Sequence, residues 1–396
     1  SAASDVYKRQ EGVFLLYSRS QTEGQRLLTC IPAMLLCYWC FGYGAWLCLA
    51  LMLAAGIIAH HQKLSALLAV GILLLPATQY PATTWWSKPD LDREYVLSLD
   101  VEHYFGNIQK MRKHLETDRQ ILWVTYYRNL YNATHPSEIN SPVSLSRNLL
   151  AWNQPGTNGL ILPVNPSASF LSILFANELW FTLGDMTMAE HCAMLSMIFS
   201  PRNSGSRMIK RLAEINLVNG DDEAALKYLR ILDKTLLHKS WAEKRIPGQQ
   251  TPRVKEWLEK KRRDIPTQDQ LRSGNDAVTS LQNLVASNAG NLRAYEYLLC
   301  YHLLSKDLRS FVEDYVPGKV SSPIFAEALL IHLARQGNIR AEELIKYQIP
   351  VEIAKEFADY TRIYEAKDTS LKEKYGKTYW FYYHFATTEP GKESKP

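Results

Sequence analysis

Charged residues are absent from two long stretches near the N-terminus. No Asp, Glu, Lys or Arg occurs between Arg26 and Lys63, and none occurs between Lys63 and Lys88. About 20 apolar residues suffice to cross a bilayer, and a soluble core helix needs far fewer apolar residues than these stretches contain. The absence of charge excludes an ordinary soluble fold here and predicts a membrane region over residues 11–83.

Three membrane helices fit this region better than two. The first apolar stretch is too long for one perpendicular helix, and FGYG at 41–44 interrupts it. A single helix would need an extreme tilt, which membrane helices rarely show. The expected spans are 27–41, 44–60 and 64–82, and GVFLLYS at 12–18 is expected to be the tail of an earlier span.

Basic residues in the short loops indicate the orientation of these spans, since Lys and Arg favour the cytoplasmic side. Arg19 and Arg26 precede the first full span, and Lys63 lies between the second and third. Both charged joints are therefore expected inside. After three crossings the chain emerges outside, so residues 84–386 are expected to form an extracytoplasmic domain, followed by a disordered polar tail at 387–396.

The first ten residues, SAASDVYKRQ, resemble the translation of a sequencing adaptor that recurs at the ends of metagenomic fragments. A segment of this kind is a processing artefact and does not belong to the fold. On this interpretation the chain is a fragment of a longer bacterial protein, and the natural N-terminus is missing.

Common catalytic motifs are also missing. The sequence has no HExxH, no GxSxG, no phosphate-binding glycine loop and no zinc-type cysteine pair outside the predicted membrane region. We therefore expect no catalytic residue, no metal site and no cofactor among the residues present. Cys192 and Cys300 are the only cysteines beyond residue 83, and two separately buried thiols are favoured over a disulfide. His191 precedes Cys192 within a predicted helix, where neighbouring side chains diverge.

Two polar pairs within the predicted membrane region have a functional and a structural interpretation. His60 and His61 are adjacent, so on a helix they point about 100° apart and do not easily share one metal ion. A polar cytoplasmic joint is favoured over a metal or proton-relay site. Cys37 and Cys40 form a CxxC motif that could exchange thiols, but no second external dithiol accompanies it. A role for both cysteines as small apolar packing residues is favoured over thiol exchange.

The small net charge argues against nucleic-acid binding. Subtracting the five basic and three acidic residues of 1–83 from totals of 45 and 40 leaves 40 and 37, a net charge near +3. Nucleic-acid binding normally requires a concentrated basic face. The densest basic run, KEWLEKKRRD at 255–264, also contains Glu256, Glu259 and Asp264, which favours a solvated helix face.

The clearest structural unit is an antiparallel helix pair over residues 207–241. Apolar residues recur there at helical spacing. Asn219 and Gly220 can end the first helix because both tolerate positive φ, and Asp221 can begin the second, where a carboxylate suits the positive helix end. The expected core positions are Ile209, Leu212 and Ala213 in the first helix, and Ala225, Tyr228, Leu229 and Leu232 in the second.

A second unit at 169–201 has the same organisation, with Gly184 and Asp185 placed 36 residues before Gly220 and Asp221. Both units resemble the tetratricopeptide repeat, a helix-turn-helix of about 34 residues. Weaker copies follow at 294–316 and 324–347, and residues 104–115 and 121–134 could form a further pair. The stretch 245–270 is expected to be a loop with one polar helix. The predicted fold class is all-α, with transmembrane helices followed by a tetratricopeptide-like α-solenoid of antiparallel helix pairs.

Two segments carry a resemblance to a known family. RLAEINLVNGDDEAALKYLRILDKTLLHKSWA at 211–242 and KTYWFYYHFA at 377–386 resemble an uncharacterised family of gut-bacterial polytopic inner-membrane proteins with a C-terminal tetratricopeptide-like domain. The resemblance covers most of residues 25–386. It implies a multi-pass protein of the bacterial inner membrane with a periplasmic helical domain, and it implies no activity.

The repeat alignment predicts a binding surface. The first helix of each pair lines the concave face of a solenoid, and a mixed, charged groove of this kind can accept a peptide or a loop of a partner protein. For any single residue a solvated helix face remains the alternative. The candidate binding residues are Glu178, Phe181, Arg207, Lys210 and Glu214.

The C-terminal segment KTYWFYYHFATTEP at 377–390 places six aromatic residues in seven positions. Aromatic faces can stack on sugars or lie at lipid headgroups. A helix that caps the exposed core of the last repeat is the favoured interpretation.

Two functions are compatible with these observations. The first is a membrane-anchored helical-repeat protein that binds or scaffolds a macromolecular partner outside the cytoplasm. The alternative is the C-terminal fragment of a polytopic membrane enzyme, such as a lipid-linked glycosyl or oligosaccharide transferase. In that case the catalytic residues lie in missing membrane helices, and the repeats position an acceptor.

Overall fold

The computed structural model divides by contacts into two compact units, Ser1–Leu91 and Asp92–Pro396. The predicted membrane spans, His60, His61 and the CxxC motif lie outside the described residues. Within the described ranges no helix is both long enough and apolar enough to cross a bilayer. The structure describes residues 91–116, 119, 121–135, 145–151, 156–164, 170–199, 205–267 and 276–386.

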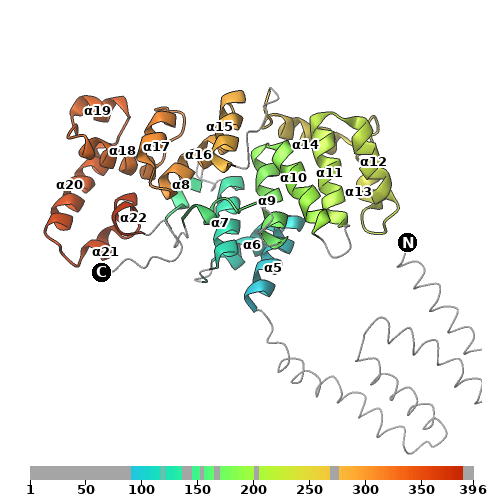
Figure 1. The fold of residues 1–396 in the computed structure, drawn as a ribbon, viewed down its shortest axis with the longest axis horizontal. Coiled ribbons are helices and arrows are strands. Elements are labelled where there is room, and N and C mark those ends of the chain that lie inside the picture. Colours follow the sequence, from blue (N-terminus) through green and yellow to red (C-terminus); the bar gives the residue numbers. More distant parts are fainter. Residues whose placement is uncertain are drawn as a thin grey trace, which may run out of the picture. The chain divides into compact units, whose positions relative to one another are not determined.

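The described residues form eighteen α-helices and one short 3-10 helix, with no strand among them (Figure 1). The all-α prediction is therefore confirmed for this part of the chain. The helices are α5 (Leu91–Phe105), α6 (Ile108–Leu115), α7 (Leu122–Thr134), α8 (Leu145–Asn148), η1 (Gly156–Gly159), α9 (Phe170–Leu183), α10 (Met186–Ile198), α11 (Ser206–Asn219), α12 (Asp222–Asp233), α13 (Lys239–Glu243), α14 (Pro252–Arg262), α15 (Ala277–Ser287), α16 (Leu292–Leu304), α17 (Leu308–Asp314), α18 (Pro323–Arg335), α19 (Ala341–Lys346), α20 (Val351–Glu365), α21 (Leu371–Tyr375) and α22 (Tyr379–Phe385).

Two consecutive helix pairs, α9–α10 and α11–α12, have the turn chemistry that the sequence predicts. Gly184 and Gly220 follow α9 and α11 with φ of 93° and 82°, a conformation that costs glycine little. The next residue then caps the following helix. Asp185 Oδ1 accepts a hydrogen bond from Met188 N at 2.8 Å, and Asp221 Oδ1 accepts one from Ala224 N at 3.0 Å.

The two pairs pack in series, since α10 contacts α9 on one side and α11 on the other (Figure 1). The predicted core positions of the second pair are largely confirmed. Ala213, Leu229 and Leu232 are buried together with Ala242 of α13, and Ile209, Tyr228 and Trp241 pack against them. Ala225 belongs instead to the main hydrophobic core.

The helices before the two pairs supply partners for α9. Gly106, at φ 69°, ends α5 inside the segment 104–115 that was expected to form one helix, and α6 then packs on α7. Tyr126 and Tyr127 of α7 are fully buried. The Tyr126 hydroxyl donates to Phe175 O of α9 at 2.6 Å, and the Tyr127 ring lies edge-on to the Phe175 ring at 5.2 Å.

The C-terminal helices follow the sequence prediction in part. α16 and α17 form the expected pair within 294–316. The pair expected at 324–347 needs correction, because α19 has six residues and none of them is buried. The apolar surface of α18 packs instead against α17, α20 and α22.

The aromatic helix α22 packs into this C-terminal region, as expected for a closing segment. Tyr379 and Trp380 are fully buried. The Trp380 ring lies 5.3 Å from Phe357 and 5.5 Å from Tyr360, and Trp380 Nε1 donates to Glu327 O at 3.0 Å. Most of the aromatic surface is therefore used for internal packing, while Phe385 remains 43% exposed.

Candidate functional site

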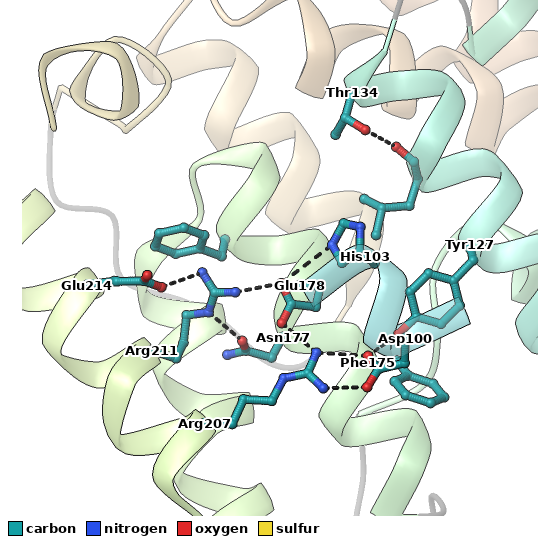
Figure 2. Close-up of polar contacts among 12 residues, drawn as sticks. Asp100, His103, Tyr127, Thr134, Phe175, Asn177, Glu178, Arg207, Arg211 and Glu214 are labelled. Carbon is teal, nitrogen blue, oxygen red and sulfur yellow. Dashed lines mark hydrogen bonds and ion pairs between the residues drawn. The ribbon is translucent and has the colours of Figure 1, made fainter. Parts of the chain in front are cut away.

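All five predicted binding residues lie on helices α9 and α11. Ion pairs connect two of them, Glu178 and Arg207, to α5 (Figure 2). Glu178 and Phe181 of α9 are buried, whereas Arg207, Lys210 and Glu214 of α11 are partly exposed. The expectation of an open groove is therefore corrected for the α9 residues. α5 and α14 cover them, which the repeat pattern of α9 and α11 alone does not reveal.

Glu178 is the centre of this network, which we call the charged layer. Its Oε1 accepts from Arg207 Nη2 at 2.9 Å, and its Oε2 accepts from Arg211 Nη2 at 2.5 Å. His103 Nε2 of α5 lies 3.7 Å from the same Oε2. Figure 2 shows both arginines reaching from α11 toward this carboxylate. The buried Glu178 of α9 therefore holds two successive turns of α11.

Asp100 of α5 is the second acid of the charged layer and is also buried. Arg207 donates to both of its oxygens, Nη1 to Oδ2 at 2.5 Å and Nη2 to Oδ1 at 2.8 Å. The Tyr127 hydroxyl donates to Oδ1 at 2.5 Å. A two-pronged arginine–carboxylate contact fixes orientation as well as distance. The layer therefore fastens α5, the first described helix, to α11.

Arg211 completes the layer on the side of α14. Its Nε donates to Asn177 Oδ1 at 2.9 Å, and its Nη1 lies 3.0 Å from Glu214 Oε2. The guanidinium also lies over the Phe181 ring, 3.9 Å from the centroid, in a cation–π contact. Asn177 stands where the other repeat has Ala213, and its amide donates to Ala189 O at 2.6 Å.

The electrostatics of the layer favour the charged forms of Glu178 and Arg207. Burial alone would raise the pKa of the Glu178 carboxyl, but Arg211, His103 and Arg207 outweigh burial and hold it well below its usual range. Burial opposes the charge of Arg207 as well, yet Glu178 and Asp100 raise its pKa above the ordinary value. Burial raises the pKa of Tyr127, with a further contribution from Asp100, so its hydroxyl stays a donor.

Lys210 occupies the outer edge of the layer. Its Nζ lies 3.3 Å from the Tyr104 hydroxyl, 4.4 Å from the Tyr104 ring centroid and 5.2 Å from the Trp241 ring centroid. The Arg245 guanidinium also lies over the Trp241 ring, 4.1 Å from its centroid. We call Tyr104, Lys210, Trp241 and Arg245 the cationic rim, and all four are partly exposed.

The acids of the charged layer and the cations of the rim therefore have different partners. Asp100, Glu178 and Glu214 are all engaged in ion pairs with Arg207 or Arg211. Lys210 makes no ion pair with any described residue, and its charge rests on aromatic faces. Each acid of the inner layer therefore has an arginine partner, and the rim presents positive charge.

Lys261 of α14 approaches the layer from the opposite side to α5. Its Nζ lies 4.6 Å from the Phe181 ring centroid and 3.4 Å from Phe181 O. Burial, with a further contribution from the nearby charges of Arg211 and Arg293, lowers the pKa of Lys261 to about 8. The solvated face expected for 255–264 holds for Lys255, Glu256, Glu259 and Lys260, which are exposed, but not for Lys261.

Sequence reasoning missed five members of the layer. Arg211 had a signal, because it is four residues after Arg207 and three before Glu214 and so shares their face. Asn177 had one as well, as a polar residue at a small-residue position. No local pattern identifies the remaining members, which are Asp100, His103 and Tyr127.

The other candidate chemistry is placed apart from the layer. Cys192 and Cys300 are free and buried. Burial raises the pKa of the Cys192 thiol to about 12 and raises that of Cys300 well above its usual range. His191 is exposed beside buried Cys192, so the two side chains diverge as expected. Among the described residues no group of three or more His, Cys, Asp or Glu side chains could hold a metal ion.

Comparison with known proteins identifies the family. The model of the family of unknown function DUF6057 matches residues 10–386, and the chain belongs to this family. No curated protein and no solved structure matches the chain.

Proposed function

We propose that this DUF6057 member is a membrane-anchored helical-repeat protein that binds or scaffolds a macromolecular partner outside the cytoplasm. The charge-free stretches before Lys88 support the anchor, and the basic residues of the short loops support the orientation. The repeated glycine–aspartate turn, 36 residues apart in α9–α10 and α11–α12, supports a tetratricopeptide-like arrangement of helix pairs.

The cationic rim is the proposed binding site, and its partner is a protein segment that carries carboxylates. One observation carries this proposal: every acid of the charged layer is ion-paired internally, whereas the partly exposed Lys210 lies against two aromatic rings without an ionic partner among the described residues. A carboxylate that approached the rim would gain a charge-assisted hydrogen bond and displace no internal acid.

The charged layer supports this function by fixing the position of the cationic rim. Asp100 and Glu178 orient Arg207, and Arg207 lies 4.9 Å from the Tyr104 ring centroid, so the aromatic floor of the rim is fixed before a partner arrives. A pre-organised surface loses less conformational entropy on binding than a mobile one. In this proposal the buried ion pairs position the rim and do not themselves contact the partner.

Photo-crosslinking in the native host tests the site. A benzophenone amino acid replaces Trp241 in the full chain, and the expected result is a specific adduct with one protein. Lys210→Glu should abolish the adduct, because it reverses the charge that attracts the carboxylate. Lys255→Glu on the exposed face of α14 is the matched control and should leave the adduct unchanged. An adduct that survives Lys210→Glu would contradict the proposed site.

Cysteine labelling tests the location independently. Lys255→Cys introduces an exposed thiol into the full chain after the four cysteines before residue 83 are replaced by serine. The buried thiols of Cys192 and Cys300 should remain unreactive, since burial raises the pKa of both. A membrane-impermeant maleimide should label the variant in intact cells. Labelling only after lysis would place the domain inside the cytoplasm.

A further inference from the structure

The turn between α12 and α13 exposes two adjacent leucines. Leu236 is 97% exposed and Leu237 is 85% exposed, and Ile231 on the last turn of α12 is 45% exposed. We call residues 234–239, KTLLHK, the leucine tip. Among the described residues these two leucines are the most exposed large apolar side chains, ahead of Ile345 at 77%. Singly exposed residues are normal on a protein surface, whereas a contiguous apolar patch usually marks a contact.

The conformation of the leucine tip is well determined by internal hydrogen bonds. Thr235 N and Thr235 Oγ1 both donate to Leu232 O, at 2.9 Å and 2.7 Å. His238 N then donates to Thr235 Oγ1 at 3.2 Å. Leu232 and Ala242 on either side are buried. The backbone is therefore held on both sides while the two leucine side chains remain exposed.

Positive charge surrounds the leucine tip. Residues 227–245 contain six Lys or Arg and two Asp or Glu, a net charge of +4, while the whole chain of 396 residues has +5. Lys234 and Lys239 flank the two leucines, each two residues away, and both are exposed. Lys239 lies 4.0 Å from Glu243, a distance at the limit of an ion pair, so its charge is weakly compensated.

We propose that the leucine tip docks onto an anionic lipid surface. Leu236 and Leu237 would enter the boundary between headgroups and acyl chains, and Lys234 and Lys239 would contact lipid phosphates. This combination fits lipid better than nucleic acid, because leucine offers no flat face for a base to stack on. It also differs from the cationic rim, where the cations rest on aromatic rings. The inference goes beyond the proposed binding of a protein partner.

Site-specific fluorescence tests the proposal with the full chain in nanodiscs. Leu237→Cys carries an environment-sensitive fluorophore, with the four cysteines before residue 83 replaced by serine and the two buried ones retained. The expected result is a blue shift, and quenching by brominated lipid, in equimolar phosphatidylglycerol and phosphatidylcholine. Ile345→Cys, 77% exposed beside Glu342, Glu343 and Lys346, is the matched control and should respond to neither.

A charge reversal separates lipid docking from other causes of a signal. In the labelled protein, Lys234→Glu with Lys239→Glu should reduce the quenched fraction at least about fivefold, because each lysine near an anionic surface contributes to the attraction. No shift at position 237, an equal shift in pure phosphatidylcholine, or an equal shift at position 345 would overturn the proposal. A shift that requires an added acidic peptide in place of the anionic lipid would assign the tip to a protein partner and would also overturn it.

Discussion

The two helix pairs α9–α10 and α11–α12 contain the same glycine–aspartate turn but occupy different environments. In α9, ten of fourteen residues are buried and they lie on every side of the helix, whereas α12 buries Ala225, Leu229 and Leu232 along one face. Equivalent residues should therefore contribute differently to the free energy of unfolding in the two pairs. In the first pair, polar and turn residues meet other helices and cannot relax, while their counterparts in the second pair face solvent.

The two glutamates of the charged layer give the largest expected difference. Glu178→Gln should cost about 3–5 kcal/mol in the free energy of unfolding, because it leaves Arg207 and Arg211 buried without their shared acid. Glu214→Gln should cost less than about 1 kcal/mol, because Arg211 keeps Glu178. Chemical denaturation of both variants measures the difference. Equal costs would show that the layer is not centred on Glu178.

The pH dependence of the Glu178→Gln effect has a definite sign. The pKa of Glu178 is lower in the folded protein than in the unfolded chain, so its ion pairs stabilise the fold fully above the unfolded pKa. That stabilisation is lost as the pH falls through the folded pKa. The gap in unfolding free energy between wild type and Glu178→Gln should therefore stay constant near neutral pH and narrow progressively as the pH falls from the unfolded pKa to the folded pKa.

The two turn glycines provide the next largest contrast. A Cβ at Gly184 would lie 2.2 Å from Asp264 O, whereas a Cβ at Gly220 would meet nothing within 4 Å. Gly220→Ala should cost about 1 kcal/mol for the left-handed conformation alone. Gly184→Ala should cost about 2–4 kcal/mol, since it adds a backbone clash to the same strain. Thermal unfolding compares the two, and equal shifts in Tm would argue against the close approach of the Asp264 backbone.

Replacing Lys261 should stabilise the first pair. Its folded pKa is about 8, below the ordinary value of 10.5, so the unfolded chain binds more protons between these values and stability rises with pH across that window. Lys261→Met should add about 1–2 kcal/mol at pH 7, where the partly buried lysine is charged. The advantage over wild type should disappear by about pH 10. A gain independent of pH would attribute the effect to packing.

The two capping aspartates give the smallest expected contrast. Asp185 is buried, and Asp221 is exposed. Asp185→Ala should cost about 1–2 kcal/mol and Asp221→Ala about 0.5–1 kcal/mol, because solvent can satisfy the freed amide only in the second pair. Hydrogen exchange at Met188 N and Ala224 N reports each cap separately. An equal acceleration of exchange at the two amides would show that the buried and the exposed cap contribute equally.

Local features of the fold were predictable from sequence. The boundaries of α11 and α12, the glycine–aspartate turns and the core stripe of Ile209, Leu212 and Ala213 follow from helical periodicity and turn chemistry. The shared stripe of Arg207, Lys210 and Glu214 follows from spacing. Each of these features depends on residues a few positions apart, which is the range over which a helix repeats.

The tertiary structure alone decided which charges are buried and what they contact. Asp100 pairs with Arg207 across 107 residues, and Lys261 reaches Phe181 across 80, so no local pattern contains either contact. By itself, the sequence determined the two helix pairs α9–α10 and α11–α12 and the candidate charges. Whether a given charge lines an open surface or an internal layer depends on which distant helix covers it, because burial and ion pairing are properties of the assembled neighbours.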